Sequence, residues 1–219
     1  MIKAVVFDFD GLILDTETTI FLAIQQVYES YAVVLTKEQW RASVGHKHAV
    51  FDPHLFLQEA LNQTISKEVY EQQFKDTFQA LIAQQSLRPG VLEYLQYAKK
   101  NGLKIGLASN SDRKWVTNFL VQFKLIDFFE VIKTADDVSS PKPDPELYLT
   151  AIDELGVTAD QAIAFEDSPP GVRAAKRAGL YCVAVPNEMT EELSFDQYDL
   201  RLSSMAEKSL EQIINELEK

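Results

Sequence analysis

The sequence is poor in cysteine and in positive charge. Cys182 is the only cysteine among 219 residues, so an intrachain disulfide is excluded, and its apolar neighbours indicate a position in the core. The 21 Lys and Arg residues are outnumbered by 33 Asp and Glu residues, which gives a net charge of −12. Because nucleic acids and anionic membranes bind positively charged surfaces, neither is expected as a partner.

Long apolar segments are also missing. No stretch approaches the roughly 20 apolar residues that a membrane-spanning helix needs. The only apolar run near the N-terminus is interrupted by Asp8 and Asp10, which is unlike a secretory signal peptide. We therefore expect a cytoplasmic protein.

Glycine is scarce as well, and its spacing excludes three kinds of site. None of the 8 glycines forms a Gly-x-Gly pair, so the dinucleotide-binding fingerprint is absent. No Gly-Lys dipeptide exists for a phosphate-binding P-loop, and no Gly-x-Ser-x-Gly elbow exists for a serine hydrolase. Hydrophobic residues at 46% and charged residues at 25% are nevertheless typical of a folded chain with a sizeable core.

The positive signal is an alternation of strand and helix patterns. A β-branched and aromatic run at 2–9 indicates a strand buried on both faces of a parallel sheet. From residue 91 the chain alternates between helices and strands. The expected helices are 91–100, 114–123, 145–155, 171–178 and 206–217, and the expected strands are 103–108, 131–134, 162–165 and 181–185. This order predicts an α/β fold with a doubly wound, Rossmann-like parallel sheet.

Between the first strand and the rest lies a long segment with helical patterns and no convincing strand. About 70 residues are far too many for an ordinary connection between a strand and a helix. We interpret residues 15–86 as an all-helical cap domain inserted into an α/β core formed by residues 1–14 and 87–219. The two linkers, near 14–17 and 84–89, are expected to act as hinges.

Polar side chains follow four of the predicted strands at their carboxyl ends, which is where open α/β sheets bind ligands. These residues are Asp8 and Asp10, Ser109 and Asn110, Lys142, and Glu166 and Asp167. Each is ordinary alone, since single Asp or Ser residues commonly cap helices and single Lys residues are usually solvated. Their combination predicts a Mg²⁺ site beside a phosphate site, because carboxylate oxygens suit Mg²⁺ and lysine supplies further positive charge.

At these positions the chain resembles the haloacid dehalogenase-like hydrolase superfamily, within its branch of helical-capped phosphatases and β-phosphoglucomutases. The motifs that carry the resemblance are Asp8 to Glu17, Ser109, Lys142-Pro143, and Glu166 to Gly171. Together they extend over essentially the whole chain. The resemblance implies the same fold as the alternation of elements, with a helical cap over the carboxyl edge of the sheet.

The resemblance also implies roles for individual residues. Asp8 would be the nucleophile that forms an aspartyl-phosphate, and Asp10 the general acid and base, kept protonated by crowding from neighbouring carboxylates. The phosphoryl group would be held by Ser109, Asn110 and Lys142. The implied Mg²⁺ ligands are Asp8, the backbone carbonyl of Asp10, Asp167 and, as a ligand or a neighbour of the ligands, Glu166.

Two departures from the branch bear on the reaction. Its mutases resemble one another in a cap arginine and in a basic residue after the serine motif. This chain has His48 and Asp112 there, although Arg41, Lys47 and Arg113 lie nearby. We therefore favour hydrolysis of a small phosphorylated metabolite, such as a sugar phosphate, over β-phosphoglucomutase-type transfer. The other departure is Pro141, where relatives often have glycine, which leaves the path of the lysine loop open.

Substrate specificity is expected to come from the cap, through Gly45, His46, Lys47 and His48, because Gly45 ends the preceding helical pattern. A zinc site built from the three histidines, including His54, matches no standard spacing. Trp40 and Trp115 are interpreted as packing residues without a catalytic role. Two other classes stay open, a phosphate-accepting receiver domain and a catalytically silent binding module, and a monomer is the expected state.

Overall fold

The computed structural model describes residues 1–41 and 52–219. Its strands are β1 (Ala4–Phe7), β2 (Lys104–Ala108), β3 (Val131–Lys133), β4 (Ala162–Glu166), β5 (Tyr181–Ala184) and β6 (Leu200–Arg201). They form one parallel sheet in the order β3-β2-β1-β4-β5-β6. The first strand is therefore central, with β2 on one side and β4 on the other, and the expected α/β fold with a parallel sheet is confirmed.

Helices surround the sheet and fill the segment between β1 and β2. They are α1 (Thr16–Ser30), α2 (Lys37–Arg41), α3 (Pro53–Leu61), α4 (Lys67–Ile82), α5 (Val91–Lys100), α6 (Arg113–Gln122), α7 (Glu146–Leu155), α8 (Pro169–Arg177) and α9 (Leu210–Leu217). Short 3-10 turns occur at η1 (Ile126–Phe128), η2 (Ala135–Asp137) and η3 (Ala159–Gln161). In the part of the chain that the structure describes, no helix is both long enough and apolar enough to cross a membrane.

Both faces of the central strand are buried, which explains why its sequence has no polar alternation. Val5 and Phe7 point into a core beneath α5, α6 and α9, whereas Ala4 and Val6 point into a second core beneath α7 and α8. This follows from the two-residue period of a strand, which sends successive side chains to opposite faces. The double layer of helices fixes β1 in the middle of the molecule, with its carboxyl end open to the residues that follow.

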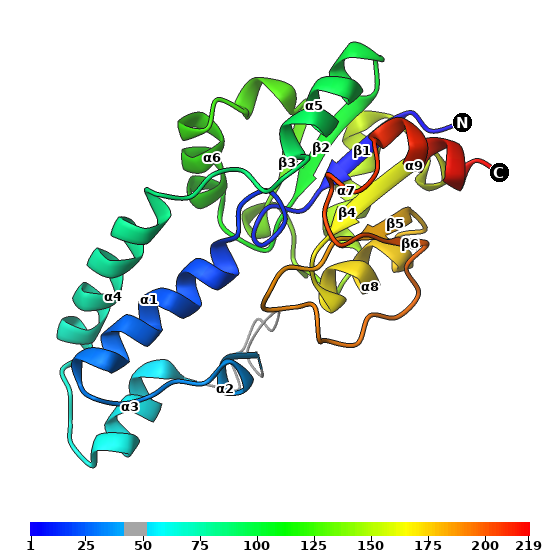
Figure 1. Ribbon diagram of the computed structural model, residues 1–219. Helices are drawn as coiled ribbons and strands as arrows, with labels where there is room; N and C mark the ends of the chain where they lie inside the picture. Colours follow the sequence, from blue (N-terminus) through cyan, green and yellow to red (C-terminus); the bar gives the residue numbers. More distant parts are fainter. Residues whose placement is uncertain (42–51) are drawn as a thin grey trace.

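Helices α1 to α4, which follow β1 along the chain, form a separate lobe beside the sheet (Figure 1). Within it α1 and α4 lie side by side, and Phe21, Tyr28 and Tyr70 belong to a third buried apolar cluster. Residues 88–90 lead the chain from this lobe back into α5. The location of the lobe agrees with a helical cap; the domain boundaries after residues 14 and 86 stay a prediction.

Local capping explains where two site-bearing helices begin. The Asp112 carboxylate accepts the backbone N–H of Trp115 at 2.7 Å, which starts α6 at Arg113. The Ser168 hydroxyl accepts the N–H of Gly171 at 3.3 Å, and α8 starts at Pro169, two residues earlier than predicted. Both caps lie within two residues of the predicted site, so they also fix the path of the loops that carry it.

Candidate active site

Lys142 lies at the centre of the predicted site. Its Nζ lies 2.5 Å from Asp8 Oδ1 and 2.6 Å from Glu166 Oε1, and it also donates to the carbonyl of Ala108 at 2.7 Å. The lysine is only 4% exposed and Glu166 is fully buried. The carboxyl ends of β1 and β4 thus meet the lysine loop at one point, as the strand-end argument predicts, although Pro141 stands where relatives often have glycine.

Two further groups hold the buried acids in place. Tyr148, on α7, donates its hydroxyl to Glu166 Oε1 at 2.5 Å. Asn187 donates its side-chain N–H to Asp167 Oδ2 at 2.7 Å and to the carbonyl of Gly11 at 3.2 Å. Asp8, Glu166 and Asp167 each present a carboxylate oxygen, and these three oxygens lie within 4.8 Å of one another.

Burial of so many acids shifts their ionisation. Burial, only partly opposed by Lys142, raises the pKa of Asp8 to about 8, with Glu166 adding to the rise. Burial and then the charges of Asp8 and Glu166 raise the pKa of Asp167 well above its usual value. Burial lowers the pKa of Lys142, but Asp8 and Glu166 outweigh this and hold it above its ordinary value, so the lysine stays charged.

The residues present fit a divalent cation. Three buried carboxylates face one lysine, which leaves the cluster with two uncompensated negative charges if all the acids ionise. Their hard oxygen atoms are the ligands that Mg²⁺ prefers. A second positive group would also offset the free-energy cost of burying the ionised carboxylates of Asp8 and Asp167. Asp8, Asp167 and Glu166 are the side chains that would hold it.

Hydroxyl and indole groups donate hydrogen bonds to the Asp10 side chain. Two carboxylates, those of Asp8 and Glu17, also lie near enough for the charge of Asp10 to raise their pKa values. Asp10 Oδ1 accepts from Thr16 Oγ1 and from Trp115 Nε1, each at 2.9 Å. Its Oδ2 accepts from Ser111 Oγ at 2.5 Å and from Ser109 Oγ at 3.4 Å. The Asp10 carboxylate is thus held by four donors at the edge of the cluster.

The phosphate-site candidates come from two loops that are fastened together. The Asn110 side chain accepts the N–H of Lys142 at 2.8 Å and donates to its carbonyl at 3.0 Å. The Asn110 amide therefore positions the lysine loop, and a role in binding phosphate stays a prediction. Ser109 is buried beside Asp10, so the hydroxyl, the lysine and both aspartates lie around one point at the end of β1 and β2.

Close approach of the chain to these acids depends on two glycines. Gly11 has φ +80, and a Cβ there would lie 2.2 Å from Asp167 Oδ2. A Cβ on Gly171 would lie 1.9 Å from Glu166 Oε2. Any side chain at either position would push an acid out of place, which gives both glycines of the sequence motifs a steric reason.

Sequence reasoning missed several residues of this arrangement, including Tyr148 on α7 and Thr16 at the start of α1. Asn187 follows β5 at the same sheet edge, so the rule applied to the other strands would have found it. Ser111 lies two residues after Ser109 and shares its face of the loop. Trp115, interpreted as a packing residue, also donates to Asp10, and its aromatic character alone gave no signal of that contact.

Several predicted residues lie elsewhere or outside the described residues. The cap residues Gly45, His46, Lys47 and His48 fall in the segment 42–51, which the structure does not describe. His54 Nε2 donates to the carbonyl of Ile65 at 2.8 Å, and its ring lies 5.2 Å from that of Tyr70 at a tilt of 40°. The zinc hypothesis therefore gains no support from the one histidine that is placed.

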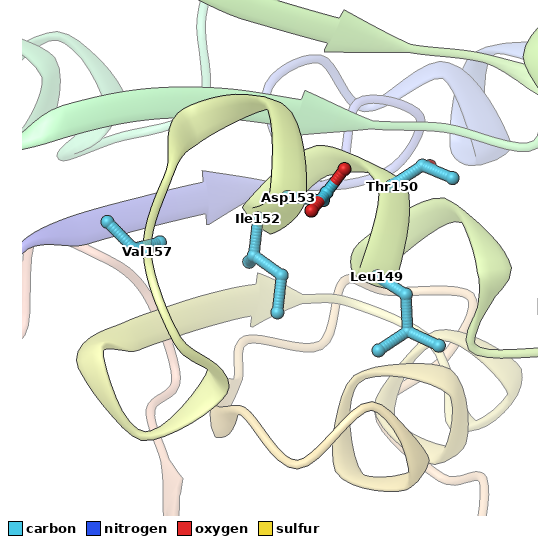
Figure 2. A pocket seen from close by; sticks show the side chains of 5 residues that line it. All are labelled: Leu149, Thr150, Ile152, Asp153 and Val157. Atoms are coloured by element: carbon cyan, nitrogen blue, oxygen red, sulfur yellow. The ribbon is translucent and has the colours of Figure 1, made fainter.

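A surface pocket of about 460 Å³ lies along α7, away from this cluster. Its lining residues are Leu149, Thr150, Ile152, Asp153 and Val157 (Figure 2). None of them is a predicted site residue, and the side chains are mostly aliphatic. The concentration of buried acids and lysine at the strand ends is a far stronger indication of chemistry than this shallow aliphatic surface.

Comparison with known proteins agrees with the geometry. Residues 5–185 match the haloacid dehalogenase-like hydrolase family. The chain is 48% identical to YhcW of Bacillus subtilis (strain 168) over 217 residues, which cover 99% of this chain and 98% of the relative. It is 35% identical to the "Phosphorylated carbohydrates phosphatase" of Thermotoga maritima over 183 residues, 81% of this chain and 82% of that one.

Among solved structures, CbbY from Rhodobacter sphaeroides in complex with phosphate aligns with a TM-score of 0.72 at 28% identity. The alignment covers 94% of this chain and 96% of that one. The family match extends over most of the chain and includes all four strand-end motifs. The chain therefore belongs to the haloacid dehalogenase-like hydrolases, in their phosphatase branch, and is an enzyme.

Proposed function

We propose that the protein is a Mg²⁺-dependent phosphatase that hydrolyses a small phosphorylated metabolite, such as a sugar phosphate, through an aspartyl-phosphate on Asp8. The observation that carries the proposal is the buried contact of Lys142 with both Asp8 and Glu166, at 2.5 and 2.6 Å, beside the Asp167 carboxylate. This arrangement combines a nucleophile, a fixed positive charge and the ligands for a second one.

In the first half-reaction, a carboxylate oxygen of Asp8 attacks phosphorus and the bond from phosphorus to the ester oxygen breaks. A carboxylate is a weak nucleophile, so the phosphate must be held in line and its charge neutralised. Lys142 and the Ser109 hydroxyl do this from the lysine and serine loops. Bound Mg²⁺ would add positive charge on the side of Asp8 and Asp167.

Asp10 moves the protons. Its carboxylic acid gives a proton to the leaving oxygen as the ester bond breaks, and the carboxylate then takes a proton from the attacking water. Water attacks phosphorus, the bond between phosphorus and Asp8 breaks, and inorganic phosphate leaves. Contact of Asp10 Oδ2 with Ser109, at 3.4 Å, supports this role because it brings the acid to the edge of the phosphate site.

Hydrolysis is favoured over the mutase alternative by what the nearby charged groups already do. A mutase needs a free basic group for a second phosphate after the serine motif. Asp112 there caps α6, and Arg113 donates to both oxygens of Asp137, at 2.6 and 2.7 Å, and to the carbonyl of Ile132. The arginine is thus directed toward η2.

The proposed substrate class follows from the relatives and from charge. The Thermotoga relative is named for phosphorylated carbohydrates, and an acidic protein attracts anions only through local positive groups, which suits small esters. The segment that contains Gly45, His46, Lys47 and His48 stays our proposal for specificity. A cytoplasmic location, a monomeric state and no binding to nucleic acid also stay proposals.

Phosphate release from a panel of phosphorylated metabolites, measured with Mg²⁺ and with EDTA, tests the proposal. Asp8→Asn serves as the blank because it keeps the shape of the side chain while removing the nucleophilic carboxylate. We expect release that requires Mg²⁺ and that falls at least a thousandfold in the variant, since loss of a nucleophile removes the covalent route.

Two other outcomes would overturn the proposal. Conversion of β-glucose 1-phosphate to glucose 6-phosphate without phosphate release would establish the mutase. An absence of turnover in both assays, with phosphate still binding to the folded protein, would establish the silent binding module. Circular dichroism of Asp8→Asn separates loss of activity from loss of folding.

A further inference from the structure

Trp115 lies between the Asp10 carboxylate and a helix of the cap. It belongs to the first turn of α6, and its indole Nε1 donates to Asp10 Oδ1 at 2.9 Å. The same ring stacks on Phe78 of α4, with centroids 5.5 Å apart and planes at 29°. One half-buried side chain thus touches both the proton-carrying group of the proposed reaction and the cap.

The chemistry of the indole group decides which oxygen of Asp10 it controls. An indole nitrogen only donates, whereas hydroxyl groups can donate or accept. Oδ1 is therefore always an acceptor while the contact with Trp115 exists. Oδ2 faces only hydroxyl groups, those of Ser109 and Ser111, and it is the oxygen on the side of the phosphate site.

We propose that Trp115 is a positioning residue: its N–H holds Asp10 Oδ1, which directs Oδ2 toward the phosphate site, and its ring transmits the position of the cap to this contact. The proposal rests on the proposed function, in which Asp10 exchanges protons with the substrate. In that reaction the proton leaves Asp10 Oδ2 for the ester oxygen and returns to Oδ2 from water.

The link to the cap follows a continuous run of aromatic rings. Phe74 and Phe78 of α4 stack with centroids 5.8 Å apart, and Phe78 then stacks on Trp115. Trp115 meets Phe119 edge-on at 4.9 Å, and Phe119 lies 6.2 Å from Phe9, the residue between the two catalytic aspartates. A movement of α4 against the core must displace the contact between Phe78 and Trp115.

The first test compares two leaving groups. Trp115→Phe keeps a ring and removes the N–H. An alkyl ester needs a proton on its leaving oxygen, whereas p-nitrophenolate leaves without one near neutral pH. We expect kcat/KM to fall about tenfold for the best sugar phosphate of the panel and less than threefold for p-nitrophenyl phosphate. Trp40→Phe, a matched change in the cap, should leave both values within twofold.

Equal losses for the two esters would overturn the positioning role, because a general disturbance of the fold does not distinguish leaving groups. Unchanged values in Trp115→Phe would overturn it as well. A double-mutant cycle with Phe78→Leu tests the cap link. We expect the second substitution to have a smaller effect on sugar phosphate turnover once Trp115 is changed; additive effects would overturn the link.

A measurement without turnover separates this inference from the proposed function. In ¹⁵N-labelled protein the two indole N–H resonances are assigned with Trp40→Phe. We expect Asp10→Asn to shift the Trp115 resonance by more than the Trp40 resonance, even if no ester is hydrolysed. A Trp115 resonance that does not shift in Asp10→Asn would overturn the contact. A shifted resonance, together with a parent protein that has no phosphatase activity, would instead overturn the proposed function.

Discussion

Glu17, in the first linker, has a pKa that its surroundings raise. Burial, followed by the charges of Asp10 and Asp15, raises its pKa from 4.5 to about 7. The folded protein therefore binds a proton on Glu17 more tightly than the unfolded chain does. Between pH 4.5 and 7 this contribution to stability decreases as the pH rises, and above pH 7 the loss is complete.

Glu17→Gln removes the titration and should change the pH dependence in a defined direction. Relative to the parent protein, the variant should gain roughly 1 to 3 kcal/mol of unfolding free energy between pH 4.5 and 7.5, after allowance for partial exposure. Chemical denaturation in EDTA across this range measures the gain. The exposed Glu93→Gln provides the matched control, and a difference independent of pH would contradict the prediction.

At the scale of elements, Arg88 connects the second linker to two segments of the core. Its guanidinium donates to the carbonyls of Gly11, Val185 and Pro186, the last two at 3.1 and 2.7 Å. Its own backbone N–H donates to Ile13 at 3.0 Å. The linker that we expected to act as a hinge is thus anchored at its core end.

Arg88→Met should therefore weaken the fold, because three carbonyls lose a charged donor that the methionine cannot replace. We expect a loss of about 2 to 4 kcal/mol in the free energy of unfolding. Urea denaturation followed by circular dichroism measures it. Arg173→Met, on the exposed side of α8, should change stability by less than about 0.5 kcal/mol; an equally small effect at Arg88 would show that the anchor is unimportant.

Sequence patterns predicted the long elements well and the short ones poorly. The five strands from β1 to β5 and the helix α5 lie where their apolar patterns placed them, within a few residues. The two-residue strand β6 was missed because Leu200–Arg201 is too short for any periodicity. Helix α3 was missed although Asp52 as its cap and Pro53 in its first turn are a helix-start signal. The last helix begins at Leu210, after its Ser209 cap, four residues later than predicted.

The same reasoning located most of the candidate site but not its internal contacts. Strand ends brought Asp8, Lys142, Glu166 and Asp167 to one place because parallel strands share an edge. The direction of each side chain depends on partners that are distant in sequence, such as Trp115, 105 residues from Asp10. A linear pattern contains no information on such a pair, so the hydrogen-bond donors to Asp10 were not predicted.

At the scale of the whole molecule, the charges of the site and the arrangement of the chain are coupled. The acids that define the site follow β1 and β4, the two central strands, and their loops lead into the cap and into α8. An unpaired charge there therefore destabilises the core of the molecule rather than a peripheral loop. We expect the free energy of unfolding of the entire protein to rise when the metal binds.

Thermal unfolding with and without Mg²⁺ makes this testable with Asp167→Asn. In EDTA the variant should unfold at a higher temperature than the parent protein, because burial and the charge of Asp8 raise the pKa of Asp167 and make its ionised form unfavourable. With Mg²⁺ at a hundred times its dissociation constant, the free energy of unfolding of the parent protein should rise by about 2.7 kcal/mol, and that of the variant by much less.

The parent protein would then be the more stable of the two with Mg²⁺, although it is the less stable in EDTA. Asp153→Asn, an exposed change on α7, should leave the unfolding temperature unchanged in both conditions. A variant that is less stable than the parent protein in EDTA would contradict the claim that the buried Asp167 charge destabilises the metal-free protein. A variant that keeps the full Mg²⁺ shift would show that Asp167 is not a ligand.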